Sequence, residues 1–311
     1  MHAVQHVTGR NSTYLSRLNE KLTVSARVHD ILYFLRVLKD AFRRAFDHDA
    51  FSVAKAAAYS SILTFFPTLV VLGTFLASSH RFDVYVGEIC NALSRILPTG
   101  SATAVEYVRN ARFLPAKLLI ATSLLALWTA SSAIVSWMEG FRKAYQLPHT
   151  WGVVKERLIA CSLAILAGMP LMFATILVAF GSQIGNRVLP HLGHAWGPLV
   201  LLLWTGLRWL IAGATSIGVI VLIYHHAIPR TRPLHTVVPG AVVASGLWFA
   251  ATSLFGWYLR ESATEYAVIY GVLGVGIALL VWMYLVALIV LVGAEVNAII
   301  FPRNCRTSSA A

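Results

Sequence analysis

The hydrophobic positions of the chain fall into six long apolar runs separated by polar segments. The runs cover roughly residues 56–79, 113–137, 158–182, 198–224, 237–259 and 267–300. Each run exceeds the ~20 residues that an α-helix needs to cross ~30 Å of hydrocarbon. None alternates with a period of two, and all are too long for the strands of a membrane barrel. The pattern therefore predicts an all-α, polytopic bundle of six transmembrane helices.

Two of the runs are longer than one span requires. A charge at the bilayer centre is expensive, so Arg208 is expected near one face, which places the fourth span at about 207–224. The last run opens with Gly271, Gly274 and Gly276, and its span is expected at about 277–300. The resulting organisation is a basic region over 1–55, a membrane domain over 56–301 and a tail over 302–311.

Composition supports a membrane protein. Hydrophobic residues make up 58% of the 311 positions and charged residues 12%, whereas soluble domains average about 45–50% and about 25%. A folded soluble protein of this size could not keep so much apolar surface away from water. Three widely spaced cysteines, Cys90, Cys161 and Cys305, indicate no disulfide framework. The first 50 residues lack a continuous apolar segment, so no cleavable signal peptide is expected.

The distribution of lysine and arginine predicts the orientation of the bundle. The regions before the first span, after the last one and between alternate spans carry 17 of these residues, and the opposite side carries six. Positive residues accumulate on the cytoplasmic side of membrane proteins. Both termini are therefore expected in the cytoplasm.

The segment 26–48 is predicted to form an amphipathic helix. Its apolar positions recur at helical spacing at Val28, Ile31, Leu32, Leu35, Leu38, Phe42 and Phe46. Cations flank this stripe at Arg36, Lys39, Arg43 and Arg44. Such a helix can lie on anionic phospholipid headgroups at the cytoplasmic face of the bilayer. It can also pack on the cytoplasmic face of the protein itself, and the two arrangements are compatible.

Four residues are candidates for transport or gating. Pro67 interrupts the first span and is expected to kink it, which frees backbone carbonyls. Glu295 and Asn297 lie near the cytoplasmic end of the last span and are candidates for a polar gate. Arg208 is the candidate for electrostatic attraction on the outer side. The alternatives are simple packing for the proline and a hydrated interfacial position for the glutamate.

Small residues spaced by four predict close helix–helix packing in a compact bundle. The candidates are Ala126, Ala130, Ala214, Gly218 and Gly240. Gly293, beside Glu295, is also expected to let another backbone come close. A homo-oligomer is a further possible partner arrangement. The histidine pairs His191/His194 and His225/His226 have no accompanying acidic cluster, and no zinc-protease motif, phosphate loop or dinucleotide fingerprint is present. No catalytic residue, metal or cofactor is therefore expected.

Several stretches, in order and at fitting spacing, resemble one known family over about residues 35 to 301. They are AKAAAYSSILTFFP (54–67), LWTASSAIVSWMEGFRKAY (127–145), YHHAIP (224–229), PGAVVASGLWF (239–249), Tyr258, YGVLG (270–274) and WMYLVALIVLVGAEVNAII (282–300). On these stretches the chain resembles the YihY/BrkB family of bacterial inner-membrane proteins, formerly named ribonuclease BN. The resemblance implies six spans with both termini inside.

The sequence leaves three candidate functions. The first is movement of a solute or a lipid across the inner membrane, suggested by proline-interrupted spans and by Glu295 and Asn297 at a membrane boundary. The second is a structural or scaffold role in the envelope, in which the basic cytoplasmic face holds lipid or a partner. No specific nucleic acid is expected as a partner. The third is the tRNA-processing nuclease that the old family name implies. It is the least favoured, because metal-dependent hydrolysis needs clustered ligands and the 13 acidic residues are scattered.

Overall fold

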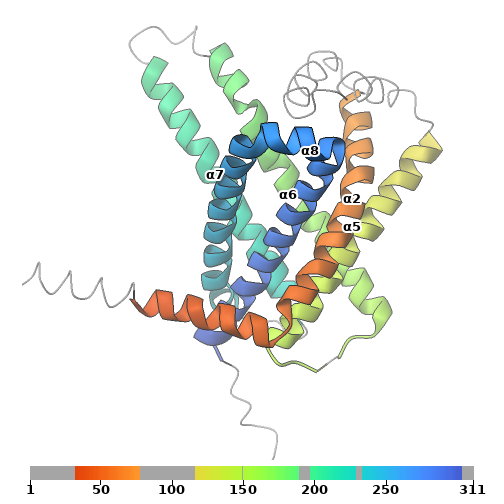
Figure 1. Cartoon of the computed structure of the whole chain (residues 1–311), viewed down its shortest axis with the longest axis vertical. Coiled ribbons are helices and arrows are strands. Elements are labelled where there is room, and N and C mark those ends of the chain that lie inside the picture. Colours follow the sequence, from red (N-terminus) through yellow and green to blue (C-terminus); the bar gives the residue numbers. More distant parts are fainter. Residues whose placement is uncertain (1–31, 78–115, 149, 189–196, 229–232, 303–311) are drawn as a thin grey trace, which may run out of the picture.

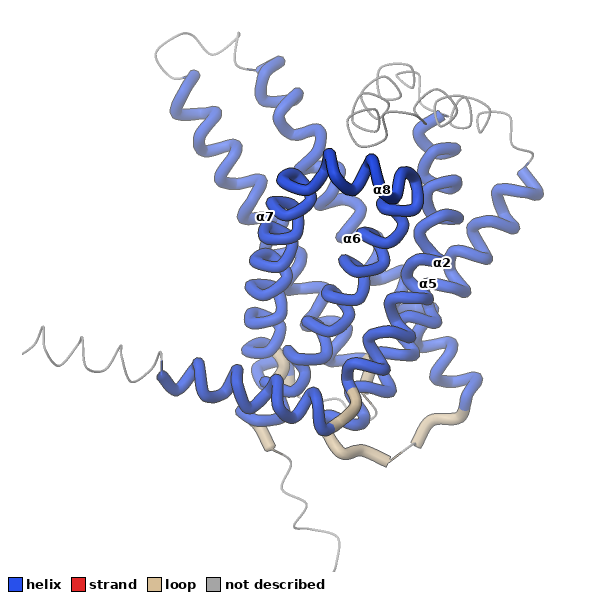
Figure 2. Tube along the Cα trace, in the orientation of Figure 1, coloured by secondary structure: helices blue, strands red, loops and turns tan. Residues whose placement is uncertain are grey.

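The computed structural model describes residues 32–77, 116–148, 150–188, 197–228 and 233–302. Every secondary-structure element within these ranges is helical (Figure 2). The helices are α2 (Ala50–Ala77), α5 (Ala116–Ala144), α6 (Val153–Val188), α7 (Gly197–His226) and α8 (Val238–Ile300), with a short 3-10 helix, η3 (Leu234–Thr236), before α8. A further helix over residues 32–47 precedes α2 and is called here the N-terminal helix.

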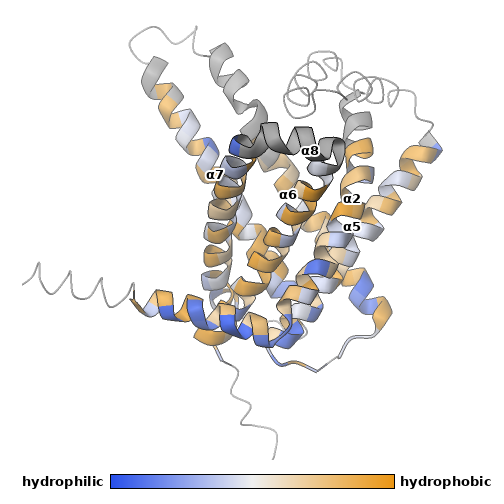
Figure 3. Ribbon diagram, in the orientation of Figure 1, coloured by the Kyte–Doolittle hydropathy of each residue, from blue (hydrophilic) through white to orange (hydrophobic). Residues whose placement is uncertain are grey.

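Six stretches of these helices are long and apolar enough to cross a membrane, which confirms the predicted six-helix membrane fold. They are Ala50–Val71, Lys117–Ala144, Val153–Ala174, Leu202–His226, Val238–Leu259 and Gly276–Ile300. Figure 3 shows that apolar residues predominate along these stretches, and many of their large apolar side chains are exposed, as expected for helices surrounded by acyl chains. The protein is a multi-pass membrane protein.

The last two spans belong to one continuous helical element. α8 contains 63 residues, and a straight α-helix of that length would extend about 95 Å. Figure 1 shows that α8 instead turns back on itself, so that its two ends lie at the same end of the bundle. The turn lies between the two apolar stretches of α8 that are long enough to cross a membrane, Val238–Leu259 and Gly276–Ile300.

The two ends of the bundle differ in charge and in packing. The start of α2, the end of α5, the start of α6, the end of α7 and both ends of α8 share one end, which is called here the basic end (Figure 1). The N-terminal helix lies across this end, crosswise to the spans. α2 packs mainly on α5 and α8, and α6 packs on α7 and α5.

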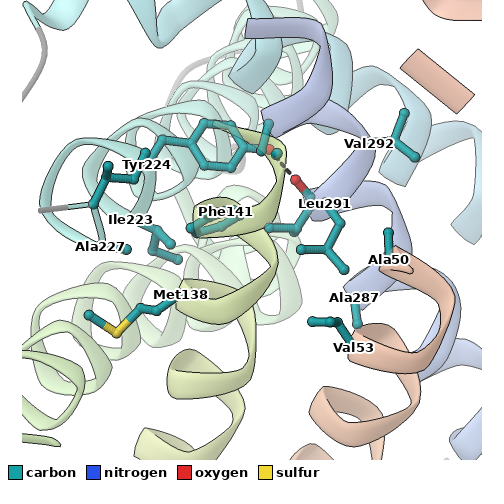
Figure 4. Close-up of a cluster of buried hydrophobic side chains, with 14 of the residues drawn as sticks. Ala50, Val53, Met138, Phe141, Ile223, Tyr224, Ala227, Ala287, Leu291 and Val292 are labelled. Carbon is teal, nitrogen blue, oxygen red and sulfur yellow. Dashed lines mark hydrogen bonds between the residues drawn. The ribbon is translucent and has the colours of Figure 1, made fainter. Parts of the chain in front are cut away.

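The buried core lies toward the basic end. In α2 the buried residues lie within the first nine positions, up to Ala58, and in α5 they begin at Ser131. In α7 they begin at Ser216. Figure 4 shows the centre of this core, where Phe141 of α5 lies near Tyr224 of α7 and Leu291 of α8; Met138 belongs to the same core. The ring of Phe141 lies edge-on to that of Tyr224, with centroids 5.2 Å apart.

The opposite halves of the helices are less covered by protein. Large apolar side chains there are more than half exposed, including Phe66, Leu124, Trp128, Leu202 and Leu254. In Figure 1 the far ends of α6 and α7 diverge from those of α2 and α5. Among the described side chains, the tight part of the bundle is therefore its basic half.

Candidate functional site at the basic end of the bundle

The two ends of α8 meet through backbone-to-backbone contact. A Cβ atom added to Gly240 would lie 2.0 Å from the carbonyl oxygen of Gly293, and one added to Gly293 would lie 2.7 Å from the oxygen of Gly240. No side chain fits at either position without a shift of the backbone. This close approach places the last turns of α8 directly against its first turn.

Asn297 joins the two ends of α8 by hydrogen bonds. Its Oδ1 accepts the Gly240 N–H at 2.6 Å, and its Nδ2 donates to the carbonyl of Val237 at 3.0 Å. The first N–H groups of a helix have no partner within the helix, so Asn297 supplies one from another part of the chain. The side chain is fully buried. Both polar groups of this amide are bound to backbone, which assigns it a positioning role.

Tyr224 holds α7 against the same junction. Its hydroxyl donates to the Val290 carbonyl at 2.5 Å in a fully buried position (Figure 4). The hydroxyl also lies 2.4 Å from the place that a Cβ atom on Gly293 would occupy. The glycine therefore accommodates both the first turn of α8 and the tip of this tyrosine.

Glu295 lies in the same turn with its carboxylate only partly hydrogen-bonded. Its side chain is 2% exposed, and Oε1 lies 2.7 Å from Nδ1 of His48. Its other oxygen, Oε2, is buried and has no hydrogen-bond partner among the described residues. A buried carboxylate oxygen without a partner is costly and is available to a proton or a cation.

The turn before α2 brings His48 to this carboxylate. Asp49 has a positive φ of 59°, which Asp tolerates better than most residues, and this conformation separates the N-terminal helix from α2. A hydrogen bond from Ser52 is the main cause that lowers the pKa of Asp49; desolvation opposes it less strongly, and the charge of Lys143 lowers the pKa further. Lys143 Nζ lies 3.5 Å from the Asp49 carboxylate, which links this turn to the end of α5.

The N-terminal helix rests on the basic end through small residues. Val37, Ala41 and Ala45 face the bundle and are buried. Leu32, Leu35, Phe42 and Phe46 are exposed. The helix therefore packs on the protein through one face and leaves a second apolar face uncovered by the chain.

A second ion pair closes the loop between α5 and α6. Arg142 Nη1 bonds Glu156 Oε1, and both side chains are largely buried. A shallow hollow beside it is lined by Glu139, Arg142, Lys143, Gln146 and Leu147. In the parts of the chain that the structure describes, no group of three or more His, Cys, Asp or Glu residues is placed to hold a metal ion.

The other candidate residues lie away from the junction. Pro67 is inside α2, which continues through it as a helix. Arg208 lies 16 residues before Tyr224 in α7, about 24 Å along the helix, and its Nε is buried without a hydrogen-bond partner among the described residues. Ala126 and Ala130 are half-buried in α5. Ala214 and Gly218 are exposed in α7, and nothing lies within 4 Å of a Cβ atom built on Gly218.

The hydroxyl groups along α2 and α5 bond mainly to their own helices. Ser61, Thr64, Thr129, Ser131 and Ser136 each donate to a carbonyl three or four residues earlier. The pair His191/His194 lies outside the described residues.

The sequence pattern does not single out His48 or Arg157, which both make contacts in the structure. His48 appears only as the end of a predicted helix, and its partner lies 247 positions away. Arg157 directly precedes the third apolar run, which is expected to begin at residue 158, whereas α6 begins earlier, at Val153.

Comparison with known proteins places the chain in a family. Over 269 residues it is 26% identical to the ribonuclease-like protein YfkH of Bacillus subtilis, covering 86% of this chain and 96% of that protein. Over 290 residues it is 27% identical to the UPF0761 membrane protein PBPRA3489 of Photobacterium profundum, covering 88% and 85%. No solved structure matches it. The family model described as virulence factor BrkB matches residues 41–309. The chain belongs to the virulence factor BrkB family of membrane proteins.

Proposed function

We propose that this protein is a permease-like carrier of the bacterial inner membrane that moves a solute or a lipid. In this proposal the basic end faces the cytoplasm, where the junction of Glu295, His48 and the two ends of α8 is a closed gate. The charge distribution along the sequence supports the orientation. The relatives described as membrane proteins support the location in a membrane.

The observation that carries the proposal is the unequal packing of the two halves of the bundle. Buried residues concentrate at the basic end, and large side chains toward the other end remain exposed. A carrier that alternates between two open states is closed on one side at a time. A scaffold would gain most from uniform packing along its helices.

Glu295 suits a gate because its carboxylate has two arrangements, one bound to His48 and one open to water or a cation. A buried carboxylate bound to His48 on one oxygen and unbound on the other is stabilised only while the N-terminal helix stays in place. Removal of the histidine leaves the charge buried without its partner, which favours entry of water or a cation. Asn297 and the two glycines then act as the fixed frame on which this contact opens.

Loss of His48 is expected to open the basic end. In a chain whose three cysteines are replaced by serine, a cysteine at the buried position Val53 reports opening through its reaction with a membrane-impermeant maleimide. The His48→Ala variant should raise the labelling rate from the basic side about tenfold or more, because a hydrogen bond to a charged group contributes about 1.5–3 kcal/mol. Proteoliposomes of known orientation give the side from which the reagent acts.

The matched control is His226→Ala. His226 is exposed at the same end, and among the described residues its ring bonds the Leu222 carbonyl and lies edge-on to His225, both in its own helix, so its loss should leave labelling unchanged. Equal labelling of the His48→Ala variant and its parent would contradict the gate and favour the scaffold function. Labelling from the opposite face of the vesicle would contradict the cytoplasmic orientation.

We also propose that the N-terminal helix binds anionic phospholipid headgroups. Its uncovered face is apolar at Leu32, Leu35, Phe42 and Phe46, and Arg36, Lys39 and Arg43 are exposed beside it. A helix with this pattern lies in the interface plane with its cations at the headgroups.

Hydrogen exchange of residues 32–47 in nanodiscs tests the headgroup contact. Exchange should slow when phosphatidylglycerol replaces part of the phosphatidylcholine, because anionic headgroups hold the cationic face. Replacement of Arg36, Lys39 and Arg43 by glutamine should remove this difference. Equal exchange in both lipid mixtures for the unmodified protein would show that the helix is held by the protein alone.

A further inference from the structure

Arg157 is a cation placed inside the membrane domain. It is the fifth residue of α6 and belongs to an apolar stretch able to span a membrane. Its Nη2 donates to the Trp128 carbonyl and to Ser132 Oγ, both at 3.0 Å. These partners lie 16 and 12 residues before the end of α5, about 24 and 18 Å along that helix. The guanidinium therefore reaches from the basic end toward the middle of α5.

The guanidinium is held in one orientation. Its central carbon lies 3.9 Å from the centroid of the Trp128 ring, which is a close cation–π contact. With Nη2 bound to two oxygens of α5 and the ring below it, the planar group has three contacts to that helix. A cation that served only to reach water would not need an ordered platform of this kind.

No negative charge neutralises Arg157 within the described part of the chain. The ion pairs there involve His48, Arg142 and Lys143, and the adjacent Glu156 is bound to Arg142. Arg157 Nε is buried without a hydrogen-bond partner among the described residues. An intramembrane cation that lacks a counter-ion within the protein is a candidate for binding an anion.

We propose that Arg157, Trp128 and Ser132 form a binding site for an oxyanion, a phosphate or carboxylate group carried by the ligand. The site is the substrate site of the carrier proposed above, and it rests on that function. A guanidinium matches the paired oxygens of such groups by its fork of N–H donors. Ser132 contributes a hydroxyl that can rotate to donate to the same group.

The apolar surface beside the site suits an amphiphilic ligand. Trp128 is 60% exposed, and Leu124 and Leu125, one turn away, are also more than half exposed. An oxyanion bound at Arg157 would therefore have open apolar surface beside it on α5. A lipid headgroup with its acyl chains along this surface and a free phosphate ion share the same oxyanion chemistry.

Protection from an arginine-specific reagent tests the site on the unmodified full-length protein. Phenylglyoxal is applied to the protein in a maltoside detergent free of phospholipid, and modification of Arg157 is measured by peptide mass spectrometry. One arm has detergent alone with sodium chloride, the second adds inorganic phosphate at matched ionic strength, and the third adds phosphatidylglycerol to the micelles without inorganic phosphate. Protection in the second arm identifies a free oxyanion, and protection in the third alone identifies a lipid headgroup. Equal modification in all three arms overturns the proposal.

Variants separate a binding role from a packing role. The thermal stabilisation produced by the protecting anion should disappear in Arg157→Gln, remain in part in Arg157→Lys, and be unchanged in Lys155→Gln. Lys155 is on the same turn but lies over the Trp151 ring at 6.0 Å, outside the site. An equal shift in Arg157→Gln and in the parent overturns the proposal. If Arg157→Gln does not fold, the protection experiment alone decides.

Failure of this site and failure of the carrier function give different results. The reaction of the cysteine at Val53 reports gating without any anion, so gating with an unprotected Arg157 removes only the oxyanion site. Protection of Arg157 without gating in the His48→Ala variant leaves a bound anion on a protein that is not a carrier of the proposed kind.

Discussion

Replacement of Gly240 by alanine is expected to prevent the two ends of α8 from meeting. The added methyl group would lie 2.0 Å from the Gly293 carbonyl oxygen and 2.5 Å from the Asn297 side chain. The first of these atoms is backbone and cannot move without displacing the last turns of α8. Overpacking typically costs about 1–3 kcal/mol, and a clash with backbone belongs at or above the top of that range. Thermal unfolding in detergent and the yield of monodisperse protein should both fall strongly.

Gly218→Ala is the matched control for this prediction. It is also a glycine inside a membrane helix, but nothing lies within 4 Å of the added carbon. Alanine favours a helix over glycine by up to about 1 kcal/mol, so this variant should unfold at the same temperature as the parent or higher. If Gly240→Ala were as stable as Gly218→Ala, the close contact between the ends of α8 would be disproved.

Replacement of Asn297 by alanine should produce the second-largest loss of stability. It leaves the buried N–H of Gly240 without its acceptor and the Val237 carbonyl without the Asn297 donor. The carbonyl keeps its bond from Ala241, so most of the cost comes from the N–H. An unsatisfied buried group costs about 1–3 kcal/mol, measurable as a lower unfolding temperature in nanodiscs.

Asn297→Asp separates the two bonds of this amide. A carboxylate can accept the Gly240 N–H but cannot donate to Val237, and it adds a charge beside Glu295. The unfolding temperature of Asn297→Asp should lie between those of the parent and of Asn297→Ala only at a pH low enough to protonate the new acid. A Glu139→Gln variant, which changes an exposed carboxylate at the same end, should have no effect. Unchanged stability of Asn297→Ala would contradict the capping role.

The sequence predicts the helices well because membrane spans are local features. Length, apolar content and the absence of a two-residue period are readable in any window of about 20 residues. Gly276 marks the start of the last span, whereas Arg208 lies inside the apolar stretch Leu202–His226 and not at its start. What the pattern does not predict is that the last two spans remain one continuous helical element, since a bend in a helix leaves its hydrophobicity unchanged.

The candidate site is readable only in part. Glu295 and Asn297 stand out because they are polar residues in an apolar run. Their partners do not stand out, since His48 and Gly240 lie 247 and 57 positions away. The spacing of small residues selects Gly218 and Gly240 alike, although only Gly240 lies at a helix contact. These distinctions depend on tertiary packing, which composition and period do not encode.

The distance between the two ends of α8 is the most direct test of whether they meet at the proposed gate. In a chain without native cysteines, spin labels at His235 and Phe301 report this distance by double electron–electron resonance in nanodiscs. The ring centroids of these residues lie 6.0 Å apart in the folded protein, so we expect a distribution of spin–spin distances at the short limit of the method. A straight α8 would extend about 95 Å. A distribution centred at several tens of ångströms would show that the ends of α8 do not meet, and the proposed gate would not exist.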